Sequence, residues 1–286
     1  MNGKVCVVTG ANAGIGRATA LGLAKLGATV VLVCRNSERG QAAVREIKAV
    51  SGNQAVDMVE ADLSTQAAVR QLAADLRARY SQLHVLINNA GIAPVRRSLT
   101  ADGIESAFAV NYLAPFLLTN LLLDELKASA PARVVNVAGD FHRKATIRFD
   151  DLMSEKDYSG TAANNQAKLA LIMFTYELAR RLEGTGVTAN CLHPGPTATD
   201  GPLHDPNLSA FGRAMYRIVR VFFQSPEKGA GTSIYLAASP EVDGATGEYF
   251  SKKRAVASSP ESYDLAVALR LWDVSAQLTG LARSLD

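Results

Sequence analysis

The chain has 286 residues, of which 48% are hydrophobic and 20% are charged, and this composition predicts one sizeable α/β domain. Its 30 Lys and Arg residues against 27 Asp and Glu give a net charge of +3, too small to indicate a nucleic-acid-binding surface. No apolar run reaches the roughly 18 residues of a membrane-spanning helix. The first predicted strand begins at residue 4, so we expect neither a membrane span nor a signal peptide.

Apolar stretches that predict strands recur along the chain, with helical stretches between most of them. They cover residues 4–9, 29–34, 54–59, 83–87, 132–137, 187–192 and 247–250. Strands that alternate with crossover helices predict an α/β fold with a doubly wound parallel sheet (Rossmann) of about seven strands. No linker or internal repeat indicates a second domain, so we expect a single domain over residues 1–286. The ligand site of such a sheet lies at the carboxyl ends of its strands, where the strand order reverses.

A glycine-rich loop follows the first predicted strand and precedes an Ala- and Leu-rich helical stretch. Glycines let a loop turn tightly and approach a pyrophosphate, while the helix N-terminus supplies partial positive charge. The position between strand and helix is the context that a dinucleotide site requires. We therefore predict that the cofactor is bound here by Gly10, Asn12, Gly14, Ile15, Gly16 and Arg17.

The choice of cofactor depends on two arginines. The second predicted strand ends at Arg35, with no acidic residue to accept the two hydroxyls of an NAD ribose, and Arg17 follows the third glycine of the loop. Two guanidinium groups suit a 2′-phosphate because arginine binds phosphate in a bidentate manner. The sequence therefore predicts NADP(H). The alternative is that Arg35 only begins a solvent-exposed helix.

Several motifs in chain order together resemble the short-chain dehydrogenase/reductase family. They are Thr9-Gly10-x-x-x-Gly14-Ile15-Gly16, Asn88-Asn89-Ala90-Gly91, Asn111 and Lys168. Towards the C-terminus the chain is similar to the retinol dehydrogenase branch, in His193-Pro194-Gly195, Ser225-Pro226-Glu227-Lys228-Gly229-Ala230 and Gly247-Glu248-Tyr249-Phe250. The resemblance, which runs nearly end to end, implies further cofactor-binding residues at Asp62, Leu63, Asn89, Ala90, Gly91, Lys168, Pro194, Gly195 and Thr199.

The catalytic set of that family is an Asn, Ser, Tyr and Lys group in which tyrosine gives or takes the proton. The resemblance assigns the asparagine to Asn111 and the lysine to Lys168, but it assigns the tyrosine position to Asn164 and the serine position to Gly139. A carboxamide does not titrate in the useful range, and glycine has no side chain to donate a proton. We therefore expect a site without the usual proton donor.

Other residues are candidates for the missing proton transfer. Asp140 and His142 follow the strand whose end should face the nicotinamide; alternatively, Asp140 caps a turn and His142 lies on a basic loop. Lys168 could act as acid or base if its surroundings lowered its pKa. Tyr158 is expected to be structural, and Asn164 can still orient a substrate oxygen.

Residues 199–224 contain apolar side chains at helical spacing and resemble the substrate lid of the family. The alternatives are a surface helix packed on the sheet and a membrane-skimming helix with Arg213, Arg217 and Arg220 on its polar side. As a lid, this segment would favour a bulky apolar small molecule, such as a polyketide, terpenoid or steroid of secondary metabolism.

The altered site favours hydride transfer to an activated acceptor, namely an imine, a quinone methide or a conjugated carbonyl, because losing a general acid costs on the order of 10²- to 10⁴-fold in rate. The first alternative is a non-redox cyclase or isomerase that uses bound NADP(H) as a scaffold. The second is a catalytically inactive nucleotide- or ligand-binding protein.

Two further expectations concern the surroundings of the protein. Cys6, Cys34 and Cys191 lie in apolar strand-like stretches, which predicts buried free thiols in a reducing cytoplasm and no metal site. The helices expected around residues 111–126 and 162–182 carry the surfaces that pair subunits in many members of the family, so a homo-oligomer is an open alternative to a monomer.

Overall fold

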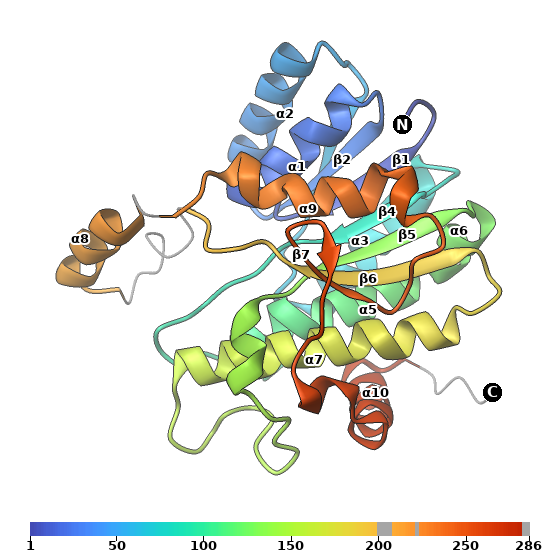
Figure 1. Cartoon of the computed structure of the whole chain (residues 1–286). Helices are drawn as coiled ribbons and strands as arrows, with labels where there is room; N and C mark the ends of the chain where they lie inside the picture. Colours follow the sequence, from blue (N-terminus) through green and yellow to red (C-terminus); the bar gives the residue numbers. More distant parts are fainter. Residues whose placement is uncertain (199–207, 221–222, 282–286) are drawn as a thin grey trace.

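The computed structural model is a layered α/β structure with helices on both faces of a central sheet (Figure 1). It describes residues 1–198, 208–220 and 223–281. Across these residues the sheet has the order β3-β2-β1-β4-β5-β6-β7-β8, and every neighbouring pair is parallel except the last. The strands are Val5–Thr9 (β1), Thr29–Cys34 (β2), Val56–Glu60 (β3), Val85–Asn88 (β4), Ala132–Val137 (β5), Val187–His193 (β6), Tyr249–Ser251 (β7) and Arg254–Ala255 (β8).

The predicted doubly wound parallel sheet is confirmed. The order reverses between β1 and β4, which is where a fold of this kind opens a crevice for a ligand at the carboxyl edge. The seven predicted strands correspond to β1 to β7. The prediction missed β8, a two-residue antiparallel strand that is too short to produce an apolar alternation.

The helices form one layer on each side of the sheet (Figure 1). They are Gly14–Lys25 (α1), Ser37–Ser51 (α2), Gln66–Arg79 (α3), Ser106–Phe108 (α4), Ala114–Leu121 (α5), Leu123–Ala128 (α6), Gly160–Arg181 (α7), Ala210–Val219 (α8), Pro226–Ala238 (α9) and Leu265–Thr279 (α10). One layer contains α1, α2 and α9, and the other contains α3, α5, α7 and α10, whereas α8 projects from the side of the molecule (Figure 1).

Both faces of the sheet are apolar because its strands are covered on both sides. Cys6 and Val8 point to the α1 and α9 layer, whereas Val7 points to the opposite layer, so successive residues of β1 fill two separate cores. The three cysteines are buried and free, as predicted. In the described part of the chain, no helix has the length and apolar character needed to cross a membrane.

The helix expected around residues 111–126 is not one regular α-helix but three consecutive segments. It contains a π-helical turn at Ala109–Leu113 (η1), then α5 and, after a break at Leu122, α6. Single π turns inside helices occur often at functional sites because they change the direction of a side chain. Here the π turn contains Asn111, which is fully buried.

Candidate active site

The loop between β1 and α1 can approach a dinucleotide only because it contains glycine. Gly10 has φ +65° and a Cβ there would lie 2.9 Å from Cα of Ala90, while a Cβ on Gly16 would lie 2.3 Å from the carbonyl oxygen of Gly10. Thr9 Oγ1 accepts hydrogen bonds from the amides of Asn89 (2.9 Å) and Ala90 (3.0 Å). These contacts hold the loops after β1 and β4 side by side at the reversal of the strand order.

The N-terminus of α1 is open to an anion. Its N-cap residue, Ala13, makes no side-chain hydrogen bond, and the first turn contains no acidic residue, whereas side chains cap α2, α3, α7, α9 and α10. Uncapped amides at a helix N-terminus carry partial positive charge and bind phosphate well. The loop and the helix end therefore fit the pyrophosphate of a dinucleotide.

The two arginines expected at the ribose, Arg17 and Arg35, differ from each other in their surroundings. Nη1 of Arg17 is 2.7 Å from Glu46 of α2, and both side chains are partly exposed. Arg35 is exposed directly after β2. Arg17 is therefore paired with a carboxylate, and it would have to exchange or share that partner to bind a 2′-phosphate. Asp62 and Leu63 follow β3 as expected, and Asp62 accepts a hydrogen bond from the amide of Ser64 (3.0 Å).

The segment expected at the nicotinamide is organised by Gln224. Nε2 of Gln224 donates to the carbonyl of Pro194 and to Oγ1 of Thr197 (3.1 Å). The backbone amide of Gln224 donates to the carbonyl of Pro196 (3.0 Å). Gly195 has φ +83°, and a Cβ there would lie 2.5 Å from Nε2 of Gln224. The segment is thus held in one conformation. Thr199, also expected to bind the cofactor, lies outside the described residues.

Asn164 occupies the position expected for the catalytic tyrosine and is fixed by Asn111. Nδ2 of Asn111 donates to Oδ1 of Asn164 (2.8 Å) and to the carbonyl of Ile92 (2.8 Å), while Oδ1 of Asn111 accepts from the amide of Ile92 (2.8 Å). The amide orientation of Asn164 follows, because its oxygen is the acceptor. Its Nδ2 has no hydrogen-bond partner among the described residues, so it can donate to an added ligand.

Lys168 lies one turn after Asn164 on α7, and positions four apart share a helix face. Its Nζ donates to the carbonyl of Val137 at the end of β5 (2.8 Å). A Cβ on Gly91 would lie 3.5 Å from this Nζ and 3.3 Å from Oδ1 of Asn111, so the two polar groups flank the same small residue. Burial lowers the pKa of Lys168 to about 8.

Gly139, at the position expected for the catalytic serine, leaves open space. Its backbone is extended (φ −177°, ψ 161°), and a Cβ there would have no neighbour within 4 Å. The Cβ of a serine would therefore fit at this position without displacing any of the described atoms around it. The adjoining Ala138 is buried.

Asp140 is exposed and belongs to an ion pair with Arg143 (2.9 Å). Partial desolvation would raise the pKa of Asp140, but the hydrogen bond and the positive charge of Arg143 outweigh it and hold this pKa below its usual value. Asp140 is therefore ionised at neutral pH. An ionised carboxylate cannot donate the proton, so this state argues against the general-acid role predicted for Asp140, and turnover of the D140N variant tests that role.

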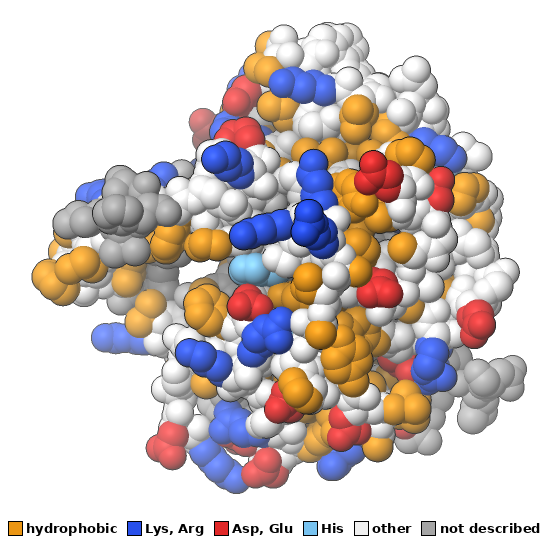
Figure 2. Space-filling view, in the orientation of Figure 1, with side chains coloured by type: hydrophobic (Ala, Val, Ile, Leu, Met, Phe, Trp, Pro, Cys, Tyr) orange, Lys and Arg blue, Asp and Glu red, His pale blue; other side chains and the backbone are white. Residues whose placement is uncertain are grey.

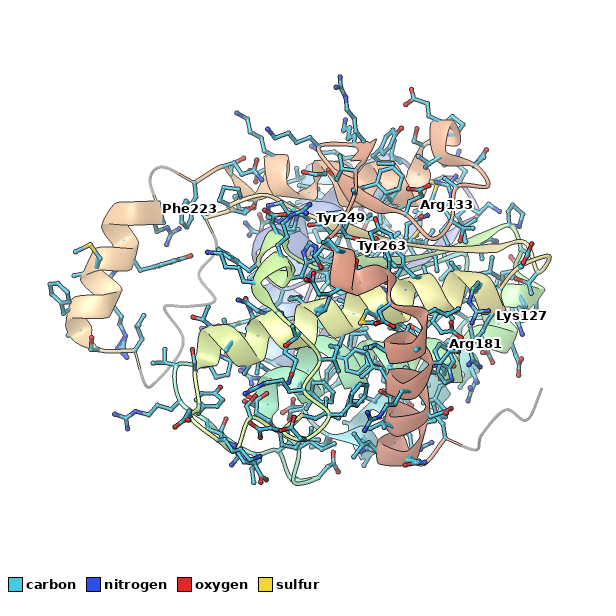
Figure 3. All side chains as sticks on the ribbon, turned by 60° about the horizontal axis from the view of Figure 1, so that its bottom comes forward. Lys127, Arg133, Arg181, Phe223, Tyr249 and Tyr263 are labelled. Carbon is cyan, nitrogen blue, oxygen red and sulfur yellow. The ribbon has the colours of Figure 1, made fainter. Side chains whose placement is uncertain are left out.

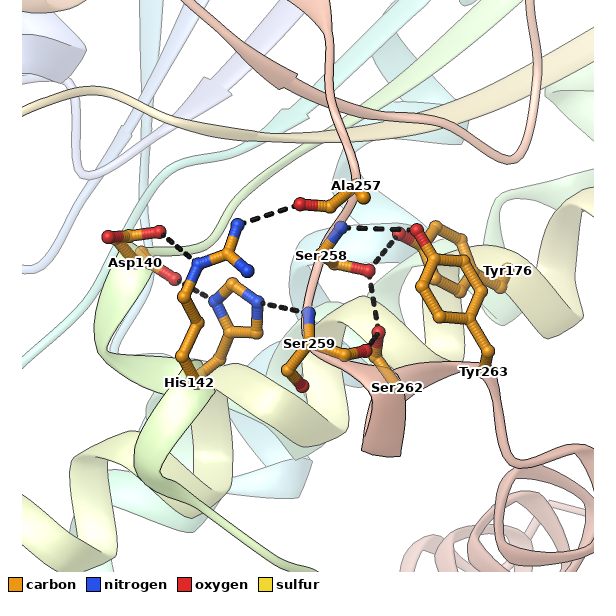
Figure 4. A network of polar contacts seen from close by, with 10 residues as sticks. Asp140, His142, Tyr176, Ala257, Ser258, Ser259, Ser262 and Tyr263 are labelled. Carbon is orange, nitrogen blue, oxygen red and sulfur yellow. Dashed lines mark hydrogen bonds and ion pairs between the residues drawn. The ribbon is translucent and has the colours of Figure 1, made fainter.

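His142 is fully buried in a polar network with the segment after β8 (Figure 4). Its Nδ1 is 2.6 Å from the carbonyl of Gly139, and the amide of Ser259 donates to its Nε2 (3.0 Å). The ring is thus protonated on Nδ1 and neutral, and burial lowers the pKa of His142. Both nitrogens are engaged, so the expected basic surface loop is wrong for His142. The histidine instead fixes the backbone of Gly139.

Tyr158 is structural, as expected. It precedes α7, and its hydroxyl donates to the buried carboxylate of Glu105 (3.2 Å). That carboxylate also accepts from the amides of Ala107 (3.0 Å) and Phe108 (2.8 Å) at the start of α4. Tyr158 therefore links the start of α7 to the helix that carries Asn111.

The expected lid lies only partly within the described residues. Residues 199–207, 221 and 222 are outside them, whereas α8 is amphipathic and exposes Phe211 (75%) and Met215 (45%). A hollow separates the projecting part of the molecule from its body, and Lys and Arg side chains gather beside it (Figure 2). Phe223 lies near the base of this projecting part (Figure 3). The lid function stays a prediction.

The loop, the sheet order and the position of Lys168 agree with a comparison across protein families. A family model described as short chain dehydrogenase matches residues 4–203. The chain belongs to the short chain dehydrogenase family. The match covers more than half of the chain and includes the glycine loop, Asn111 and Lys168.

Within the short chain dehydrogenase family, the chain is similar to retinol dehydrogenases. It is 42% identical to human retinol dehydrogenase 14 (99% of this chain, 88% of the relative) and 44% identical to human retinol dehydrogenase 11 (98% and 86%). A crystal structure of an uncharacterised protein from Mycobacterium paratuberculosis is 32% identical, with a TM-score of 0.77 over 98% of this chain and 94% of that one. The RhlG/NADP complex of Pseudomonas aeruginosa is 27% identical, with a TM-score of 0.68 over 87% and 94%.

Sequence patterns alone missed the residues that position this site. Gln224 holds the expected nicotinamide segment, and the backbone of Ile92 binds both polar atoms of the Asn111 side chain. Asn136 of β5 donates to Thr175 of α7 (2.9 Å) and thereby joins the strand before Gly139 to the helix of Lys168. None of these belongs to a motif with a chemical signature, because each acts through contacts between segments distant in sequence.

Proposed function

We propose that this chain is an NADP(H)-dependent oxidoreductase that transfers hydride to an electron-poor acceptor in a bulky apolar small molecule. Imines, quinone methides and conjugated carbonyls are such acceptors. The observation that supports the proposal is the hydrogen bond from Asn111 to Asn164, because it fixes a carboxamide at the position that the resemblance assigns to the tyrosine. The relatives support the redox class, because two of them are retinol dehydrogenases and a third, RhlG, was solved in complex with NADP.

The residues present fit the cofactor. The uncapped start of α1 and the loop of Gly10 and Gly16 suit a pyrophosphate, and the segment held by Gln224 suits the carboxamide end. Bound NADPH would supply the hydride. The protein would contribute the fixed backbone around it and the polar groups on α7.

Two hydrogen-bond donors on one face of α7 can stabilise the charge that develops on the product. Nδ2 of Asn164 can donate a hydrogen bond to the acceptor group without releasing a proton. Lys168 is mainly an ammonium at neutral pH, since its lowered pKa is about 8, and it can stabilise an anionic product or protonate it. Activated acceptors suit this arrangement because their reduced forms are neutral or delocalise the charge.

NADPH consumption with matched acceptors tests the proposal. One member of each pair is a conjugated aldehyde or iminium ion, and the other is the saturated ketone of the same size. We expect turnover of the activated member only, by a factor on the order of 10² or more, because that is the penalty for a missing general acid. Equal turnover of both members would contradict the proposal. Conversion of a substrate without NADPH consumption would favour a cyclase or isomerase instead.

We further propose a cytoplasmic location, which the three buried free cysteines support because free thiols persist in reducing compartments. Assembly into a homo-oligomer stays a prediction. Leu117 and Leu118 are buried within the subunit, so they belong to its core.

A further inference from the structure

The hairpin between β7 and β8 has an unusual loop sequence. Ser251 pairs with Arg254, so its two loop residues are Lys252 and Lys253. Both have positive φ values, 51° and 63°. A two-residue hairpin loop of this kind strongly favours Asn-Gly or a similar pair, because side chains larger than Asn are strained at positive φ. Two lysines are therefore a poor choice for the turn on conformational grounds.

The hairpin lies at the same edge of the sheet as the candidate site. Strand β7 is parallel to β6, and Ser251 is in register with His193, which directly precedes Pro194 of the expected nicotinamide segment. The amide of Lys253 donates to Oγ1 of Thr232 on α9 (3.2 Å), which anchors the loop. The lysines are thus held at a fixed place beside the site.

The basic loop has a cation–π contact on its α9 side, where Nζ of Lys253 lies 6.0 Å from the centroid of the Tyr235 ring. Lys252, Lys253 and Arg254 are exposed, and none of them forms an ion pair with any residue in the described part of the chain. Asp140, which follows β5 at the same edge, is already paired with Arg143. Figure 2 shows Lys and Arg side chains gathered beside the hollow. Adjacent exposed cations repel one another modestly in water, and an anion bound between them would offset this repulsion.

We propose that Lys252, Lys253 and Arg254 bind a carboxylate or phosphate group at the end of the apolar substrate remote from the hydride acceptor. The proposal rests on the proposed function for the position of the substrate, and it narrows the substrate to an anionic amphiphile. Lysine and arginine supply charge-assisted hydrogen bonds to oxyanions, and the apolar part of the same molecule would extend into the site. On this account, the two lysines are present in the turn for their charge, although their positive φ angles are unfavourable.

Binding measurements can test this inference without any turnover. Isothermal calorimetry on the full chain with NADP⁺ bound would compare dodecyl phosphate and dodecanoate, each below its critical micelle concentration, with dodecanol below its solubility limit. The test variant is K252Q/K253Q. The control is K25Q/K127Q, which removes the same charge from exposed lysines just before β2 and β5, at the opposite edge of the sheet; Figure 3 shows Lys127 far from Tyr249 of β7.

We expect K252Q/K253Q to weaken binding of the two anionic probes about five- to tenfold, since exposed ion pairs contribute modestly, and to leave dodecanol binding unchanged. The control should bind all three like the wild type. Equal loss in both variants would show a nonspecific charge effect and overturn the inference. Weaker NADP⁺ binding in K252Q/K253Q would assign the loop to the cofactor and overturn it as well.

A second variant separates binding from folding. K252N/K253G gives the turn its preferred residues, so we expect a higher Tm, by about 2–4 °C, together with the same loss of anion binding. Unchanged anion binding in this variant would refute the inference. Selective loss of binding to phosphatidylserine vesicles, with dodecyl phosphate binding intact, would make the loop a membrane contact and refute it too. Failure of hydride transfer alone would affect only the proposed function.

Discussion

Restoring a proton donor should convert this site into one that reduces ordinary ketones. The change is the double variant G139S/N164Y. Gly139 is extended, and a Cβ there meets nothing within 4 Å, so the serine fits without rearrangement. Residue 164 shares a helix face with Lys168, whose pKa is already lowered to about 8. The positive charge of Lys168 would therefore lower the pKa of the new tyrosine at position 164.

The expected gain follows from the role of a general acid. A positioned proton donor contributes about 10²- to 10⁴-fold, or roughly 3 to 5 kcal/mol of transition-state stabilisation. The substitution also removes the hydrogen bond between Asn111 and Asn164, which costs about 1 kcal/mol of stability. That cost bears on folding and not on the chemical step, so kcat/KM for an apolar saturated ketone should rise at least about 10²-fold.

The assay follows NADPH oxidation with saturated ketones for the wild type, both single variants and the double variant. The single variants are the matched controls, and N164Y alone should recover part of the gain. NADPH affinity is measured in parallel to show that each variant binds the cofactor. A double variant that is folded, binds NADPH and remains inactive on ketones would refute the reasoning, because the missing donor would then not be what limits the site.

Three other predictions concern single groups. kcat/KM for reduction should fall about tenfold per pH unit as the pH rises above about 8, since the ammonium of Lys168 is then lost; a level profile up to pH 9.5 would contradict its role. D140N should leave turnover unchanged in steady-state assays, because Asp140 is ionised and paired with Arg143; a large loss would make it catalytic. H142A should lower the free energy of unfolding by about 2–4 kcal/mol in urea titrations, since a buried ring and two hydrogen bonds are removed; unchanged stability would show that the network of Figure 4 does not hold the segment.

The fold could be predicted from the sequence because each strand carries its own local signal. The strands predicted at residues 29–34 and 132–137 have the bounds that the structure shows, since both stretches are rich in valine and lie between helical stretches. The two-residue β8 could not be predicted, because its pairing depends on β7 and on a turn with an atypical sequence. The π turn around Asn111 was missed as well, because no periodic pattern in the sequence marks it.

Only part of the candidate site could be predicted from the sequence. The glycine loop was correctly placed, because the conformation of Gly10 and the close approach at Gly16 require glycine. The surroundings of His142 could not be read from its neighbours Arg143 and Lys144, because its partner Ser259 comes from a segment 117 residues later. The partner of Arg17 was missed likewise, as Glu46 lies on another helix.

Deuterium transfer from NADPH that carries deuterium at both C4 positions is the most direct measurement of the central claim. The protein is incubated with the labelled cofactor and the activated acceptors, and each product is analysed by mass spectrometry. Hydride transfer without a tyrosine donor predicts a product that carries one deuterium from the cofactor. A converted substrate without deuterium would contradict the claim and make the bound nucleotide a scaffold for a non-redox reaction.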